Sequence, residues 1–175
     1  MSLQPEPRVL LSRQEIEAAV NSLAAELNRD YHGKHPVLIG VLKGSFMFLA
    51  DLVRRLNFPL EVEFVRLSSY GCRTESSGRV RMAQGLGCSV TGRDVLVVED
   101  IVDTGLTLAR LLEYLRRKKP ASLKLCALTD KPSRRQVPVS IDYLGFSVPG
   151  KFLVGYGLDF KERFRNLPDI CVLEE

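Results

Sequence analysis

The chain has 175 residues, of which 45% are hydrophobic and 26% are charged. These values match an average globular protein and exclude a disordered or collagen-like chain. The net charge of +4 suits an anionic substrate as well as nucleic acid, and it does not decide between them.

The first part of the chain predicts two helices and two strands. Residues 12–15 (SRQE) have the form of a capping box, and apolar residues at helical spacing over 16–27 predict the first helix. The apolar run 37–42 (VLIGVL) is typical of a strand covered on both faces. Apolar spacing over 46–56 predicts a second helix, and the alternation over 61–67 (EVEFVRL) predicts another strand.

A polar segment separates these elements from the next ones. Residues 68–79 (SSYGCRTESSGR) have almost nothing to bury, and we expect a functional loop within one domain. A buried strand is predicted at 95–98, a third helix at 108–115 and a strand at 123–128. The basic run in which the third helix ends, 116–119, is typical of a solvated helix C-terminus.

The alternation of strands and helices predicts an α/β fold with a central, mainly parallel sheet flanked by helices. The elements after Pro138 are short and strand-like, and we expect them to form a small hood lobe with the N-terminal residues. Residues 1–175 would then be a single domain, with the hood formed by the first residues and roughly 138–175. No signal peptide and no membrane-spanning run is visible, and no C-x-x-C pair occurs, so we expect a cytoplasmic protein without membrane association.

The segment 95–107 (VLVVEDIVDTGLT) carries most of the chemical information. A buried strand leads into Glu99 and Asp100, then Asp103, then a glycine-containing turn that opens a helix. Ligands of open parallel sheets bind at the carboxyl ends of strands, and the free N–H groups at the start of a helix suit a phosphate. Two carboxylates ahead of such a turn suit the hydroxyls of a sugar phosphate. Neither a Walker loop nor a dinucleotide fingerprint is present.

This segment resembles the phosphoribosyl pyrophosphate (PRPP) loop of the type I phosphoribosyltransferases. Within them, the chain resembles the hypoxanthine-guanine phosphoribosyltransferase family from about residue 9 to residue 175. Further segments that carry the resemblance are 41–45 (VLKGS), Ser69-Tyr70, Lys131-Pro132, 148–159 (VPGKFLVGYGLD) and Arg165.

The resemblance implies a role for each matching residue at the PRPP site. Glu99 and Asp100 would hold the ribose hydroxyls, and Thr104, Gly105, Leu106 and Thr107 would cradle the 5′-phosphate. Some family members carry lysine at the position of Leu106, which we interpret as tuning, because the backbone donors remain. Lys43, Gly44 and Arg165 would bind pyrophosphate, in a turn that in the family often contains a non-proline cis peptide.

The resemblance also implies a purine site, a metal and a lid. Asp103 would accept the proton from N7 of the purine, and Lys131 would donate to O6, which disfavours adenine because a lysine has donors only. Phe152 would stack on the base, and the carbonyls of Leu153 and Asp159 would face its 2-position. The Asp159 side chain would contact Mg²⁺, with Glu99 and Asp100 as further metal candidates. Ser69 and Tyr70 would belong to a lid over 68–79.

The implied reaction is purine salvage, in which hypoxanthine or guanine and PRPP give IMP or GMP and pyrophosphate with Mg²⁺. We expect a homodimer or homotetramer and no nucleic-acid partner. One alternative is an enzyme of the same mechanism that prefers xanthine. Another is a PRPP-sensing regulator that binds nucleic acid, which would need a basic face built from Arg116, Arg117, Lys118, Lys119, Arg134 and Arg135.

Overall fold

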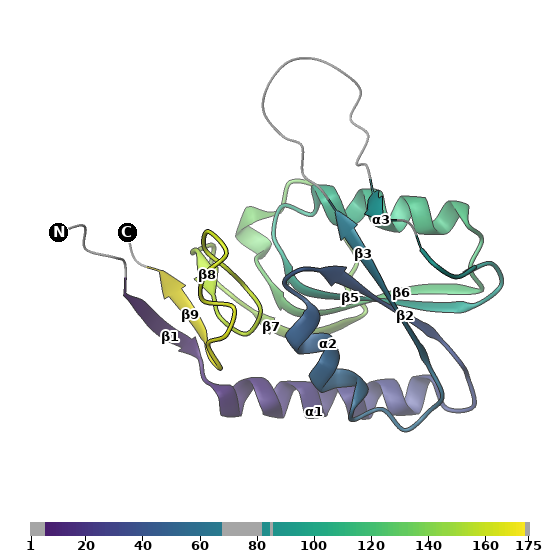
Figure 1. The fold of residues 1–175 in the computed structure, drawn as a ribbon, viewed down its shortest axis with the longest axis horizontal. Coiled ribbons are helices and arrows are strands. Elements are labelled where there is room, and N and C mark those ends of the chain that lie inside the picture. The colour runs from purple at the N-terminus through teal and green to yellow at the C-terminus, as the bar shows by residue number, and fades with distance from the viewer. Residues whose placement is uncertain (1–5, 68–81, 85, 174–175) are drawn as a thin grey trace, which may run out of the picture.

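The computed structural model describes residues 6–67, 82–84 and 86–173. A six-stranded sheet with the order β4-β3-β2-β5-β6-β7 forms its centre (Figure 1). Five of the strands run parallel, and only the edge strand β4 is antiparallel to its neighbour. Their bounds are β2 Val37–Leu42, β3 Glu61–Leu67, β4 Met82–Gln84, β5 Asp94–Val102, β6 Ser122–Asp130 and β7 Tyr143–Ser147.

Helices cover both faces of this sheet (Figure 1). Helices α1 (Arg13–Asp30) and α2 (Phe46–Val53) lie on one face, and α3 (Leu106–Arg117) lies on the other. Alternate residues of β5 point to opposite faces, so that Leu96 packs with α1 and α2 while Val97 packs with α3. The two-sided burial explains why the central strands are continuous apolar runs.

A second, three-stranded sheet with the order β1-β9-β8 stands beside the first turn of α1 (Figure 1). It consists of β1 Pro7–Leu11, β8 Leu153–Val154 and β9 Ile170–Leu173. Ile170 and Val172 of β9 join the core beneath α1, whereas Cys171 faces a smaller apolar cluster of the same lobe. The first and last strands that the structure describes thus meet in one small lobe, which we call the hood.

Several boundaries differ from the sequence predictions. The sequence assigns all residues after about 138 to the hood, but β7 pairs with β6 and belongs to the large sheet. The predicted strand at 95–98 extends through Val102, because its ladder with β6 continues to Asp130. Helix α2 ends at Val53 rather than near residue 56, since the following amides bond in tighter turns.

One local prediction, the capping box before the first helix, is confirmed. The capping box of α1 is present, with Ser12 and Glu15 bonded to each other's backbone amides. Cys126 and Cys171 are free and buried, which is typical of cysteines that pack in a core. In the described ranges, no helix is long and apolar enough to cross a bilayer.

Candidate active site

The candidate residues gather at the carboxyl ends of three neighbouring strands. Lys43 follows β2, Asp103 follows β5 and Lys131 follows β6, and β5 lies between the other two strands. The next strand in the chain, β3, pairs with one edge of β2, and β5 pairs with the other edge. Open α/β sheets bind their ligands at the carboxyl ends of the strands where the strand order reverses in this way. A pocket of about 550 Å³ opens here, lined among others by Gly44, Asp100, Phe152, Leu153, Asp159 and Arg165.

The turn after β2 fits closely against β5. A Cβ atom at Gly44 would lie 1.7 Å from Oδ2 of Asp100, so no side chain fits there without a shift. On the other side, a Cβ atom at Gly157 would lie 2.1 Å from the carbonyl oxygen of Gly44. The cis peptide bond is Leu42–Lys43, directly before the Lys43-Gly44 pair. Two glycines therefore allow the turn to pack between β5 and the loop after β8.

Glu99 and Asp100 lie within β5 and are both buried. Burial raises the pKa of Glu99 well above its ordinary value, and the neighbouring Asp100 carboxylate raises it further. Burial also raises the pKa of Asp100. The amide of Ile101 donates to Asp100 at 3.0 Å, which fixes that carboxylate at the pocket wall. Both side chains still offer acceptor oxygens held away from solvent, as recognition of sugar hydroxyls requires, because a protonated carboxyl keeps acceptor capacity.

A smaller pocket of about 190 Å³ adjoins the first and is lined by Glu99, Asp103, Thr104, Gly105 and Thr107. Gly105 is the N-cap of α3 and has a φ of 82°, in the left-handed region that favours glycine. Thr107 and Leu108 in the first turn of α3 line this pocket, and the unpaired N–H groups at the start of a helix stabilise an anion. The carbonyl of Thr104 accepts from the Gln136 amide at 2.9 Å, which holds the turn in place.

Asp103 stands between the two pockets and faces two cations. The Nζ atom of Lys131 lies 3.7 Å from Oδ2 of Asp103, and Nε of Arg134 donates to Oδ1 at 3.3 Å. Lys131 is buried, and burial lowers the pKa of its ammonium group. An acceptor and a donor therefore lie next to each other at the base of the larger pocket.

The segment 150–165, which includes β8, supplies the opposite wall. Phe152 is 51% exposed and packs edge-on against Phe160, with ring centroids 5.5 Å apart. Leu153 is buried in the main core, and its backbone pairs with β9 in the hood. The guanidinium of Arg165 donates through Nη1 to the Gly157 carbonyl at 2.8 Å and pairs through Nη2 with Oδ1 of Asp159 at 2.9 Å.

Two residues of the site were missed by the sequence analysis. Arg134 was considered only as part of a basic face, yet its guanidinium contacts Asp103. Glu162 contacts both Lys43 and Arg165. Neither residue has a local sequence signal. The contacts Arg134–Asp103 and Glu162–Lys43 join positions that are 31 and 119 residues apart. The contact between Glu162 and Arg165 depends on the path of an irregular loop.

The carboxylates predicted to hold a metal are divided between the two pockets. Asp100 and Asp159 line the larger one, and Glu99 lines the smaller one. Within the described residues, no three His, Cys, Asp or Glu side chains converge on one point. A donor set of one or two carboxylates fits Mg²⁺ that is bound together with substrate phosphates, which is how this ion usually binds.

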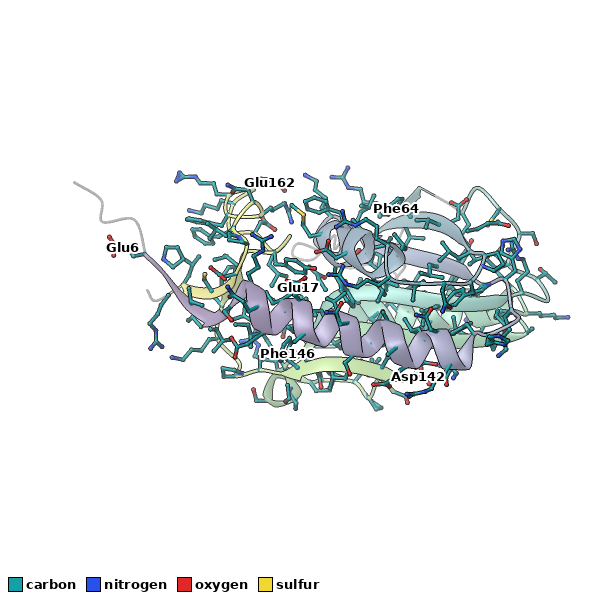
Figure 2. All side chains as sticks on the ribbon, turned by 90° about the horizontal axis from the view of Figure 1, so that it is seen from below. Glu6, Glu17, Phe64, Asp142, Phe146 and Glu162 are labelled. Carbon is teal, nitrogen blue, oxygen red and sulfur yellow. The ribbon has the colours of Figure 1, made fainter. Side chains whose placement is uncertain are left out.

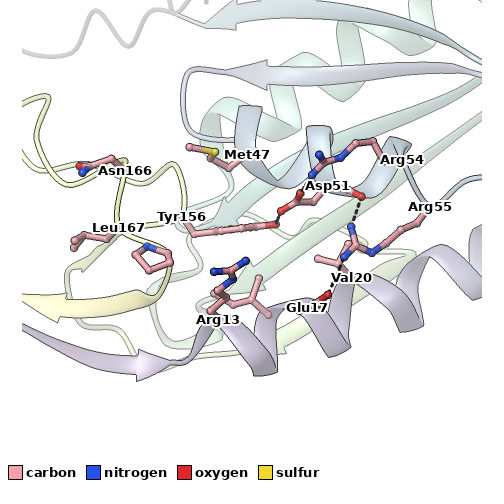
Figure 3. A pocket seen from close by; sticks show the side chains of 12 residues that line it. Arg13, Glu17, Val20, Met47, Asp51, Arg54, Arg55, Tyr156, Asn166 and Leu167 are labelled. Atoms are coloured by element: carbon pink, nitrogen blue, oxygen red, sulfur yellow. Dashed lines mark hydrogen bonds and ion pairs between the residues drawn. The ribbon is translucent and has the colours of Figure 1, made fainter.

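Two further features concern the surroundings. Ser69 and Tyr70, predicted to belong to a lid, lie outside the described residues. Figure 3 shows another pocket, of about 370 Å³, between α1, α2 and the loop that carries Tyr156. Tyr156 donates to Asp51 there at 2.6 Å, and the pocket is lined by none of the predicted site residues.

Comparison with known proteins gives consistent matches. Residues 9–161 match the phosphoribosyl transferase domain. A hypoxanthine-guanine phosphoribosyltransferase of Bacillus subtilis (strain 168) is 49% identical over 167 residues, covering 95% of this chain and 93% of the relative. The enzyme of that name from Streptococcus pneumoniae (strain R6) is 46% identical, covering 96% and 93%. A crystal structure of a hypoxanthine phosphoribosyltransferase from Staphylococcus aureus has a TM-score of 0.91 at 44% identity, covering 95% and 91%. The chain belongs to the phosphoribosyltransferase family, in its hypoxanthine-guanine group.

Proposed function

We propose that this protein transfers the 5-phosphoribosyl group of PRPP to hypoxanthine or guanine, giving IMP or GMP and pyrophosphate. Membership in the family supports the transfer. The observation that carries the choice of base is the pair formed by Asp103 and the buried Lys131, 3.7 Å apart at the base of the larger pocket. This pair offers one acceptor and one donor side by side.

A 6-oxopurine has the complementary edge. Its O6 accepts, and its N7 carries a proton in one tautomer, so Lys131 would donate to O6 while Asp103 accepts from N7. Removing that proton makes the ring a better nucleophile through N9, and a positioned carboxylate suits this general-base step. The 6-amino group of adenine would meet the Lys131 donors instead. Phe152, half exposed at the pocket wall, would stack on the base.

PRPP would span both pockets. Glu99 and Asp100 would accept hydrogen bonds from the ribose hydroxyls, and the turn of Thr104, Gly105, Leu106 and Thr107 would hold the 5′-phosphate. The left-handed Gly105 at the start of α3 supports this assignment, because it lets the backbone approach an anion closely. The side chain of Leu106 is exposed, so this residue would contribute through its amide.

Pyrophosphate would lie between Lys43, Gly44 and Arg165. The Nε atom of Arg165 is buried and has no hydrogen-bond partner among the described residues, which leaves a donor for a further acceptor. Asp159 would hold Mg²⁺, with Asp100 or Glu99 on the ribose side; when bound, the ion neutralises charge on the leaving group. The two cationic side chains add to that neutralisation as the bond to C1′ breaks and the ribose becomes oxocarbenium-like.

The ribose cation would also need protection from water. We propose that residues 68–79, with Ser69 and Tyr70, close over the site as a lid. This assignment rests on the sequence alone. Unchanged hydrogen exchange in that segment on addition of PRPP, Mg²⁺ and an unreactive purine analogue would contradict it.

The basic residues of the regulator alternative do not share one face. Arg134 and Arg135 contact Asp103 at the carboxyl edge of the sheet. The run 116–119 lies at the other edge, where the Lys119 carbonyl accepts from Gly92, just before β5 begins. A single nucleic-acid surface from these six residues would therefore need contacts at both edges, and we do not propose nucleic acid as a partner.

We further propose that the protein acts in the cytoplasm as a homodimer or homotetramer. An apolar patch supports association: Phe46, Val62 and Phe64 are each about 40% exposed on α2 and β3, and Figure 2 shows Phe64 beside α2. Light scattering of the purified protein gives the assembly size, and a monomer at micromolar concentration would contradict this part.

A pyrophosphate-release assay with PRPP and Mg²⁺ tests the proposed function. Hypoxanthine, guanine, xanthine, adenine and uracil would be supplied separately, with a reaction lacking any base as the control. We expect turnover with hypoxanthine and guanine only. Preference for xanthine would keep the mechanism and change the substrate. Binding of PRPP without turnover on any base would favour the regulator.

A further inference from the structure

We propose that Glu162 is a positioning residue of the pyrophosphate site, whose carboxylate holds Lys43 and Arg165 until pyrophosphate takes its place. The inference rests on the proposed function, because it assumes that these two cations receive the leaving group. Glu162 lies in the loop that follows β8, on the outer side of the hood (Figure 2).

One carboxylate oxygen of Glu162 serves both cations. Its Oε2 lies 2.9 Å from Nζ of Lys43 and 3.3 Å from Nη2 of Arg165. The ammonium of Lys43, through its hydrogen bond, lowers the pKa of Glu162, so the carboxylate is ionised at neutral pH. An anionic oxygen between two cations is the arrangement that a phosphate oxygen would reproduce.

The backbone of the loop places this carboxylate at the site. Lys161 and Glu162 have φ values of 52° and 63°, which are uncommon for residues other than glycine. The amide of Glu162 donates to Oδ2 of Asp159 at 2.8 Å, while Oδ1 of Asp159 pairs with Nη2 of Arg165 at 2.9 Å. Asp159 thus fixes the start of the Glu162 side chain and the Arg165 guanidinium at once. Such backbone conformations persist where neighbouring contacts determine them.

The side chain of Glu162 is free to leave. It is 65% exposed, against 44% for Lys43 and 19% for Arg165. Rotation toward solvent would bury nothing and break only exposed ion pairs, which contribute little to stability. The main effect of the Glu162 carboxylate is therefore on the affinity for pyrophosphate. An incoming pyrophosphate group must first displace the carboxylate, and the returning carboxylate favours release of the product.

The test is binding of inorganic pyrophosphate, with Mg²⁺, by titration calorimetry. Glu162→Gln keeps the size of the side chain and removes its charge. The matched control is Glu113→Gln, which removes the same charge from an exposed pair with Arg117 on α3. We expect Glu162→Gln to bind pyrophosphate about three- to tenfold more tightly, as the loss of two exposed ion pairs predicts. In turnover, we expect a lower KM for PRPP and stronger inhibition by pyrophosphate, with the KM for hypoxanthine unchanged.

A second pair of variants separates displacement from a general charge effect. In a Lys43→Met background, the gain caused by Glu162→Gln should shrink, because one of the two competing pairs is already absent. Equal tightening by Glu113→Gln, or unchanged or weaker pyrophosphate binding by Glu162→Gln, would overturn the inference. A wild-type protein that neither binds pyrophosphate nor releases it from PRPP would instead overturn the proposed function.

Discussion

Replacing Gly44 by alanine tests how the turn after β2 and the β5 carboxylates depend on each other. The added Cβ would lie 1.7 Å from Oδ2 and 2.7 Å from Cγ of Asp100. The shorter distance is half of the 3.4 Å at which ordinary contact begins. Because Asp100 is buried and accepts from the Ile101 amide, its carboxylate cannot turn away without losing that hydrogen bond.

Overpacking of this kind costs about 1–3 kcal/mol, and each kcal/mol lowers the Tm of a domain of this size by about 2–4 °C. Activity should fall by about 100-fold at temperatures where the variant is folded, since a displacement near 1 Å at a reacting group has that effect. The control is Gly87→Ala, whose Cβ would meet only the tip of Glu63 at 3.3 Å. We expect that variant to stay within about 0.5 kcal/mol of the wild type.

A double-mutant cycle identifies the contact. Asp100→Ala removes the three atoms nearest to the added Cβ, so in that background Gly44→Ala should cost less than about 0.5 kcal/mol. Urea unfolding of the four proteins measures the stabilities, and pyrophosphate release measures the activities. The double variant should be about as stable as Asp100→Ala alone, whereas its activity should not recover. An equal cost of Gly44→Ala in both backgrounds would refute the reasoning.

Three further predictions concern the proposed roles. Asp103→Asn should lower kcat by about 10²–10⁴-fold and leave the Kd for PRPP nearly unchanged; equal losses in rapid-kinetic and binding measurements would make Asp103 a binding residue. Burial raises the pKa of Glu99 above its ordinary 4.5, so the folded protein holds a proton that the unfolded chain releases, and stability falls as the pH rises through the folded pKa. Glu99→Gln should therefore show a flatter decline of Tm as the pH rises above that ordinary value, and an unchanged slope in scanning calorimetry would contradict this. Phe152→Ala should raise the KM for hypoxanthine by about fivefold or more, as loss of a base-stacking ring predicts, while a change confined to the KM for PRPP would place the ring elsewhere.

Local signals in the sequence determined most of the secondary structure and the PRPP segment. The capping box at Ser12 and the apolar spacing that follows specify α1 by contacts within a few residues. The run 37–42 specifies a strand covered on both faces, because its side chains alternate between two apolar layers. The adjacent carboxylates Glu99 and Asp100, followed by the Gly105 turn, indicate a sugar-phosphate site without any tertiary information.

Tertiary structure decided which distant groups meet. The strand at 143–147 has no signal that chooses between two sheets, and in the structure it pairs with β6 at the edge of the large sheet. The length of β5 likewise depends on its neighbour, because the hydrogen-bonded pairing with β6 continues beyond Glu99 and Asp100 to Val102. Glu162 reaches Lys43 across 119 positions of sequence. Arg134 reaches Asp103 because the loop after β6 lies against the turn after β5, where the amides of Gln136 and Val137 donate to the Thr104 carbonyl. Propensity and spacing act over one or two turns of chain, whereas these contacts depend on how the sheet and the hood pack together.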